Sequence, residues 1–94
     1  MNVTNIGLEN LGTVNKNKVK LTTNGGCITL YFSYETCVGF IAEVVKNGYN
    51  ITKCVRQNDW SKTTGKFLNE LEPDHTKRVS SEEFERRLSK LLNS

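Results

Sequence analysis

The sequence has few of the residues that build metal sites and nucleophilic active sites. Among its 94 residues are one histidine, one tryptophan, one methionine and three cysteines. His75 lies in a polar segment, and no pattern brings a cysteine beside it, so a nucleophilic pair is not expected. Cys27, Cys37 and Cys54 match no zinc spacing, so three reduced thiols are expected. We therefore expect no enzyme, no cofactor and no bound metal.

Long apolar runs and a strong charge of one sign are also missing. No run approaches the roughly 20 apolar residues of a membrane-spanning helix. Residues 1–10 have neither the basic nor the apolar part of a secretory signal, so a cytoplasmic protein without membrane contact is expected. The net charge of +3 permits contact with nucleic acid or an acidic partner. It argues against the heavily acidic proteins that imitate DNA.

The size and composition are those of one small domain. The chain is 36% apolar and 24% charged, which is ordinary for a soluble globular protein with one modest core. We expect a single domain over residues 1–94. Residues 1–12 are rich in asparagine, and they are interpreted either as a loose N-terminal arm or as an irregular first strand.

Residues 13–57 carry the alternation typical of β-strands. Asn-Gly pairs, which favour tight hairpin turns, occur at Asn24-Gly25 and Asn47-Gly48. Glu35-Thr36 interrupts the pattern, as a turn or a bulge. These breaks predict a four-stranded antiparallel meander over residues 13–23, 27–34, 37–46 and 49–57. In the last strand, Tyr49, Ile51 and Val55 are expected to point inward.

Two amphipathic helices are expected after the strands. The first covers Asn58–Leu71, where Trp60 shares a face with Phe67 and Leu71 and is expected to be buried. The second begins at Ser80, which forms a capping box with Glu83. Its apolar stripe consists of Phe84, Leu88, Leu91 and Leu92. Strands followed by helices predict an α+β fold with both helices packed on one face of the sheet.

A row of lysines is the first candidate binding surface. Alternation places Lys16, Lys18 and Lys20 on one face of one strand, beside Tyr31 of its hairpin partner. A basic row next to an aromatic ring fits a surface for phosphates and stacked bases. Lysines on an edge strand also prevent aggregation, and we favour this second interpretation.

The start of the first helix is the second candidate. Its segment Ser61-Lys62-Thr63-Thr64-Gly65-Lys66 is similar to the end of a phosphate-binding loop, but the residue after Lys66 is Phe67 instead of Ser or Thr. A looser anion site at the helix N-terminus would use the hydroxyls with Lys62 or Lys66. Gly65 inside a helix indicates either close packing or a contact that needs bare backbone, and we favour packing.

Two segments carry a family resemblance. Residues 33–40 read Ser-Tyr-x-Thr-x-Val-x-Phe, and residues 58–69 read Asn-x-Trp-Ser-x-Thr-Thr-Gly-Lys-x-Leu-Asn. Together with Arg78, Phe84 and Leu88, they resemble the signatures of a small uncharacterised family encoded largely by bacteriophages and related mobile elements. The resemblance covers about Tyr31–Leu92. The chain departs from the pattern at Phe67, where the family has His, and at Gly39, where it has Ala, so no role is expected for that histidine here.

The resemblance implies a non-enzymatic phage accessory protein that binds a host or defence component in the host cytoplasm. An inhibitor of a defence nuclease, anti-CRISPR-like, is the leading hypothesis. The alternative is a small nucleic-acid or nucleotide-binding module, and steep salt dependence would distinguish it from an apolar protein interface. In both cases the candidate binding residues are Lys16, Lys18, Lys20, Tyr31, Ser61, Lys62, Thr63, Thr64, Gly65 and Lys66.

Overall fold

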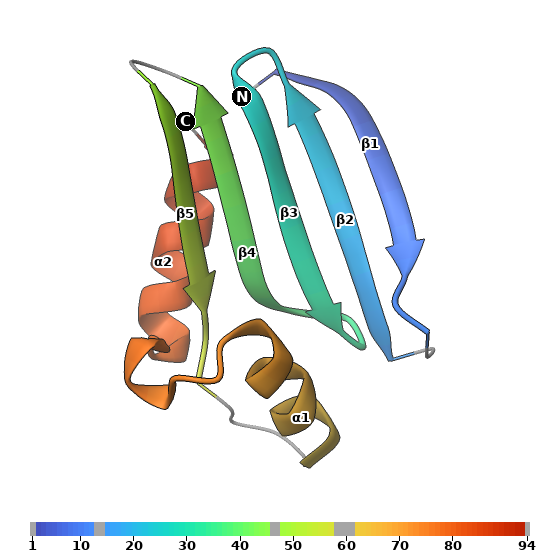
Figure 1. Ribbon diagram of the computed structural model, residues 1–94, viewed down its shortest axis with the longest axis vertical. Helices are drawn as coiled ribbons and strands as arrows, with labels where there is room; N and C mark the ends of the chain where they lie inside the picture. Colours follow the sequence, from blue (N-terminus) through green and yellow to red (C-terminus); the bar gives the residue numbers. More distant parts are fainter. Residues whose placement is uncertain (1, 13–14, 46–47, 58–61, 94) are drawn as a thin grey trace.

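The computed structural model describes residues 2–12, 15–45, 48–57 and 62–93, with the backbone only at residues 62–65. Five strands form one antiparallel sheet in chain order, from β1 at one edge to β5 at the other (Figure 1). The elements are β1 (Val3–Asn10), β2 (Lys16–Thr23), β3 (Gly26–Ser33), β4 (Thr36–Val45), β5 (Tyr49–Val55), α1 (Lys62–Leu71), the 3-10 turn η1 (His75–Lys77) and α2 (Ser81–Leu92). The α+β class and the meander are confirmed, but the sheet has five strands instead of the expected four.

The additional strand is β1. The sequence allowed two interpretations of this segment, a loose arm or an irregular first strand. β1 pairs with β2 along its whole length, with Ile6 opposite Leu21 and Leu8 opposite Val19. β1 is therefore the edge of the sheet, and β2 with its three lysines is an interior strand.

Two of the three predicted breaks are present where the sequence places them, and the third, at Asn47-Gly48, includes a residue outside the described part of the chain. Thr23 pairs with Gly26 across the Asn24-Gly25 turn, so this hairpin is confirmed. At the next turn, Tyr34 has a positive φ of 56°. The β3–β4 register also shifts between Tyr31 and Phe32, so the expected interruption near Glu35 contains both a turn and a bulge.

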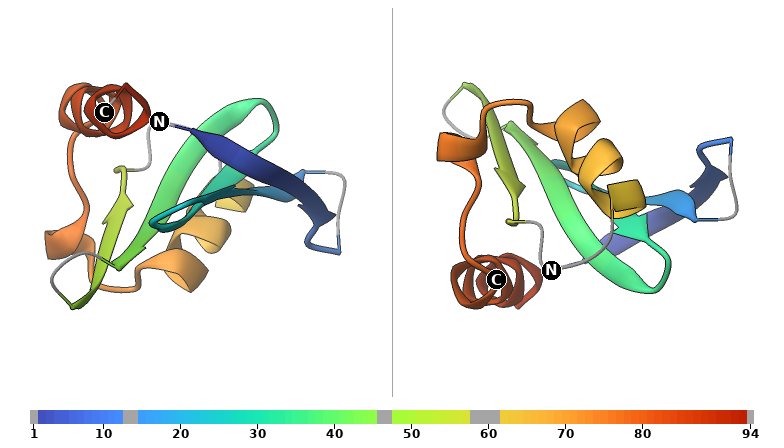
Figure 2. Two further views of the ribbon diagram at one scale, coloured as in Figure 1. Left: turned by 90° about the horizontal axis from the view of Figure 1, so that it is seen from above. Right: turned by 90° about the horizontal axis from the view of Figure 1, so that it is seen from below.

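The two helices pack on opposite faces of the sheet. Leu30 and Tyr31 are neighbours on β3, so their side chains point to opposite faces. Leu30 belongs to a buried cluster with Phe84 of α2, whereas Tyr31 packs against a cluster that contains Phe67 of α1. Figure 2 shows α1 and α2 on the two sides of the sheet. This arrangement differs from the single covered face that was expected.

The chain changes faces by passing around the edge at β5. After α1, it returns beside β5, where Gln57 N–H donates to Val79 O over 2.8 Å and Val79 N–H donates to Val55 O over 3.0 Å. The buried Arg78 side chain supports this passage. Its Nε and Nη2 donate to Glu72 O over 3.0 and 2.9 Å. The helices thus lie on different faces because their linker crosses the β5 edge.

α2 begins as predicted and is held by one central ring. Ser80 Oγ accepts from Glu83 N–H over 3.2 Å, which confirms the N-cap. The Glu83 carboxylate accepts from Arg86 and Arg87 instead of completing the box, and these hydrogen bonds lower its pKa to about 2. Phe84 is fully buried, with the Arg56 guanidinium 5.1 Å from its ring centroid.

On its face of the sheet, α1 leaves the end away from Val55 uncovered. α1 packs near Val55, which is buried as expected. The inward placement of Tyr49 and Ile51 is wrong, since they are 61% and 58% exposed. They lie at the end of β5 away from Val55, beyond the reach of α1. The predicted burial of Trp60 concerns a position outside the described residues.

Candidate functional site

The lysine row has the predicted geometry, but two of its lysines already have partners. Lys16, Lys18 and Lys20 share one face of β2, and Lys18 pairs with Tyr31 in the register. Lys16 Nζ lies 3.1 Å from Glu70 Oε1 of α1, and Lys18 Nζ lies 2.8 Å from Glu9 Oε2. The edge-strand role favoured from the sequence does not apply, because β2 is an interior strand.

Tyr31 is a packing residue instead of an open stacking platform. Its ring meets Phe67 edge-on, with centroids 6.4 Å apart and planes at 73°. Lys16 Nζ lies 5.4 Å from the Phe67 centroid on the same face. The lysine row and the second half of α1 are therefore in contact, with Phe67 in their centre. Phe67 is buried in a cluster with Val38, Val55 and Leu68, so it serves the core.

The candidate anion site at the start of α1 is described only in part. α1 begins at Lys62. Ser61 lies outside the described residues, as do the side chains of Lys62, Thr63 and Thr64 and the surroundings of Gly65. Lys66 is exposed. The choice between packing and ligand contact at Gly65 therefore stays a prediction.

A second group, which the sequence analysis did not identify, lies on the uncovered end of the same face. The Tyr49 hydroxyl donates to Glu43 Oε1 over 2.7 Å, and the Cys27 thiol donates to Glu43 Oε2 over 2.9 Å. Val45 is paired with Tyr49 and is 65% exposed; Ile51 is paired with Glu43. We call Val45, Tyr49 and Ile51 the tip patch. It is an exposed apolar surface with a fixed aromatic ring.

The electrostatics of this group stabilise its protonated donors. Hydrogen bonding to Glu43 raises the pKa of the Cys27 thiol and of the Tyr49 hydroxyl. The bonds from Cys27 and then Tyr49 lower the pKa of the Glu43 carboxyl. At neutral pH, Glu43 is thus a charged acceptor and both donors keep their protons. This arrangement holds the Tyr49 ring in place, and it does not activate a nucleophile.

All three cysteines are free thiols of low expected reactivity. Burial raises the pKa of Cys37 to about 11 and also raises that of Cys54, while the hydrogen bond to Glu43 raises that of Cys27. Because the thiolate is the nucleophile, we expect Cys37 of the native protein at pH 8 to react with a disulfide reagent roughly 100-fold more slowly than in urea-unfolded protein, and Cys27 and Cys54 also to react more slowly than in the unfolded chain. Stopped-flow absorbance measures both rates. A native cysteine that reacts as fast as in the unfolded chain would contradict this prediction.

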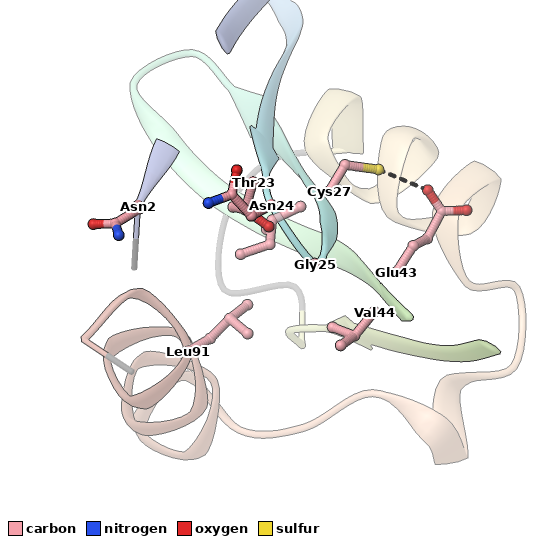
Figure 3. Close-up of a pocket in the computed structure, with 9 residues that line it drawn as sticks. Asn2, Thr23, Asn24, Gly25, Cys27, Glu43, Val44 and Leu91 are labelled. Carbon is pink, nitrogen blue, oxygen red and sulfur yellow. Dashed lines mark hydrogen bonds between the residues drawn. The ribbon is translucent and has the colours of Figure 1, made fainter. Parts of the chain in front are cut away.

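Two hollows flank α2, and neither contains a catalytic arrangement. The first, of about 290 Å³, lies between the β2–β3 turn and Leu91 (Figure 3). Figure 3 shows the Cys27 thiol and the Glu43 carboxylate on the other side of the strands from Leu91. The second, of about 510 Å³, has a mostly apolar lining of Phe40, Ala42, Val44, Thr52, Cys54, Arg87, Lys90 and Leu91. Among the described residues there is no group of three or more His, Cys, Asp or Glu side chains that could hold a metal ion.

Comparison with known proteins identifies the family. The model of a family of unknown function, DUF8033, matches residues 1–86. The chain belongs to the DUF8033 family. No curated protein and no solved structure matches this DUF8033 chain significantly. The matched family is uncharacterised, as the resemblance implied. Within the described part of the DUF8033 chain, no helix is long and apolar enough to cross a membrane.

Proposed function

We propose that this protein is a non-enzymatic phage accessory protein that acts in the host cytoplasm by binding a host or defence protein. A defence nuclease such as a CRISPR effector is the candidate target, and inhibition would come from occupying a surface of that nuclease. The observation that carries the proposal is the tip patch. Its three apolar side chains are each more than half exposed, on a sheet face that no described helix covers at that end.

The tip patch has the features of a protein-binding surface. Tyrosine is among the residues that contribute most to binding energy in interfaces. A side chain that is already held loses less conformational entropy when it binds. The hydrogen bond between the Tyr49 hydroxyl and Glu43 Oε1 provides this restraint before any partner arrives. Val45, its cross-strand partner, and Ile51, two residues along β5, add exposed apolar area on the same face.

The nucleic-acid alternative has less support. A phosphate-binding surface needs lysines whose charges are available, because affinity comes from counterion release. Lys16 and Lys18 form ion pairs with Glu70 and Glu9, and Tyr31 packs edge-on against Phe67. Two lysines of the row and its neighbouring ring are therefore engaged in contacts within the chain. Lys20 and Lys66 are exposed, and the helix start that also suggested this alternative lies partly outside the described residues.

The test compares two exposed tyrosines. Tyr49→Ala removes the ring of the tip patch, and Tyr34→Ala is the matched control, because Tyr34 is 57% exposed at the opposite end of the sheet. Wild-type protein and both variants are immobilised, and the proteins they capture from a bacterial lysate are identified by mass spectrometry. Calorimetry with each purified target then measures affinity. Tyr49→Ala is expected to weaken binding about 30-fold or more, the effect of a hot-spot residue, and Tyr34→Ala to leave it unchanged.

Two results would contradict the proposal. One is a target that binds Tyr49→Ala as tightly as wild type. The other is a captured species that is nucleic acid and whose affinity falls steeply across a salt series. The second result would favour the nucleic-acid module.

A further inference from the structure

The edge strand β1 lacks the usual protection against pairing. It is eight residues long and carries one charged residue, Glu9, with no lysine and no proline. Natural edge strands are commonly blunted by lysine, proline, bulges or short length. The only irregularity here is the register shift between Val3 and Asn5, which leaves Ile6–Asn10 regular. This part of β1 is open to another strand.

On one face of the sheet, two rows of apolar side chains run across the strands and end at β1. Leu8 continues the row that runs through Val19 and Leu30, and Ile6 continues the row through Leu21. Toward the middle of the sheet these rows are buried under α2. At β1 they are open, since Leu8 is 79% and Ile6 is 61% exposed. A further strand would cover them from the side.

The other face of β1 presents an incomplete charge pattern. Glu9 lies beside Lys18, and Gly7 lies beside Lys20, which is exposed. A Cβ built on Gly7 would lie 4.0 Å from Lys20 Cβ, an ordinary contact, so the fold of one chain does not require glycine there. The missing side chain leaves open space between Lys20 and the edge.

We propose that β1 pairs with β1 of a second copy of this chain, antiparallel and centred on Leu8, to form one continuous ten-stranded sheet. In this register Leu8 faces Leu8 of the second copy, and Gly7 faces Glu9 of the second copy. Strands are spaced by about 4.8 Å, so that Glu9 lies across the bare Gly7 from Lys20, within reach of its long side chain. Each Glu9 then contacts Lys18 of its own chain and Lys20 of the other.

Charge complementarity selects this register from its neighbours. Residues opposite each other in an antiparallel pair point to the same face of the sheet. The corresponding faces of the two copies are therefore continuous only if the numbers of the two paired residues sum to an even value. Pairing centred on Gly7 would place Gly7 against Gly7 and Glu9 against Asn5, leaving Lys20 without a carboxylate. Centring on Leu8 covers the exposed Leu8 with Leu8 of the second copy and places Glu9 of the second copy beside the bare Gly7. The inference uses the opposite edge from the tip patch and does not depend on the proposed function.

The first experiment measures the mass of the protein in solution and how its association depends on charge. Sedimentation of the purified chain over a dilution series is expected to show reversible association from 10.6 kDa to twice that mass. Glu9→Lys and Lys20→Glu should each weaken association about tenfold or more through like-charge contact, and the double exchange should restore it. Lys77→Glu, an equal charge change at an exposed site in η1, is the control and should have no effect. A chain that stays at 10.6 kDa at the highest concentration would overturn the proposal.

The second experiment tests the register. Paired residues in antiparallel strands have Cα atoms about 4.5–5.5 Å apart, within the range that a disulfide spans. Under mild oxidation, Leu8→Cys should give a dimer that a reductant separates, whereas Ile6→Cys, which faces Asn10, should not. Wild type is the control for the three native cysteines. A dimer that forms with Ile6→Cys and not with Leu8→Cys would refute pairing centred on Leu8.

Discussion

Phe84→Ala is expected to cost about 3–5 kcal/mol of folding free energy, a large part of the roughly 5–15 kcal/mol of a typical domain. Phe84 is fully buried and is the only residue of α2 in the buried cluster of that face. Its ring centroid lies 5.7 Å from that of Phe40, and the Arg56 guanidinium lies over it. The substitution removes these contacts together and leaves a cavity beneath a buried charge.

Urea denaturation followed by far-ultraviolet circular dichroism measures this cost. Tyr34→Ala, which removes an exposed aromatic side chain, is the control and should change stability by no more than about 0.5 kcal/mol. If Phe84→Ala were as stable as that control, α2 would not be anchored to the sheet through this ring.

Gly26→Ala is expected to cost about 3 kcal/mol or more, because the backbone itself would have to move. Gly26 has a φ of 152°, and an added Cβ would lie 1.8 Å from Glu43 O. The neighbouring turn is held against β4, since Val45 N–H donates to Gly25 O over 2.7 Å. Neither side of this contact is a flexible side chain that could turn away.

The adjacent glycine provides the control. A Cβ on Gly25 would meet nothing within 4 Å, so Gly25→Ala should be close to neutral. Thermal unfolding midpoints of the two variants give the comparison. Equal midpoints would mean that the β2–β3 turn can move away from β4 without loss of stability.

The parts of the fold that were predicted correctly depend on signals within a few residues. The Asn24-Gly25 turn and the N-cap at Ser80 depend on the local backbone, so each could be recognised by itself. β1 could not be recognised from its own residues, because its alternating apolar pattern is short and Gly7 interrupts it. It becomes a strand by pairing with β2, which no local preference specifies.

The side on which each helix packs was not predictable for a different reason. Both faces of β3 carry large apolar or aromatic side chains at the α1 end, as Leu30 and Tyr31 illustrate. Alternation therefore identifies a strand without showing which face a helix will cover. That choice is made by the route of the linker past β5, fixed by the bridge between Arg56 and Val79.

In the candidate site, too, the local features were predictable and the long-range contacts were not. Alternation correctly placed the lysines on one face beside Tyr31, but the pairing of Lys16 with Glu70 spans 54 positions and depends on where α1 packs. The tip patch could be predicted from the sequence in part. Val45 lies opposite Tyr49 in the β4–β5 pair, a pairing that follows from the turn predicted at Asn47-Gly48. Their exposure does not, because it depends on how far α1 extends over the sheet.

The strict chain order of the sheet has a consequence for how the protein is made. Each strand pairs only with strands next to it in the sequence, so every hairpin can close as soon as it leaves the ribosome. Both helices come later in the chain than all five strands. The residues of the sheet that α1 and α2 bury are therefore the last to be covered during synthesis. A nascent chain stalled before α1 would be the species most dependent on chaperones.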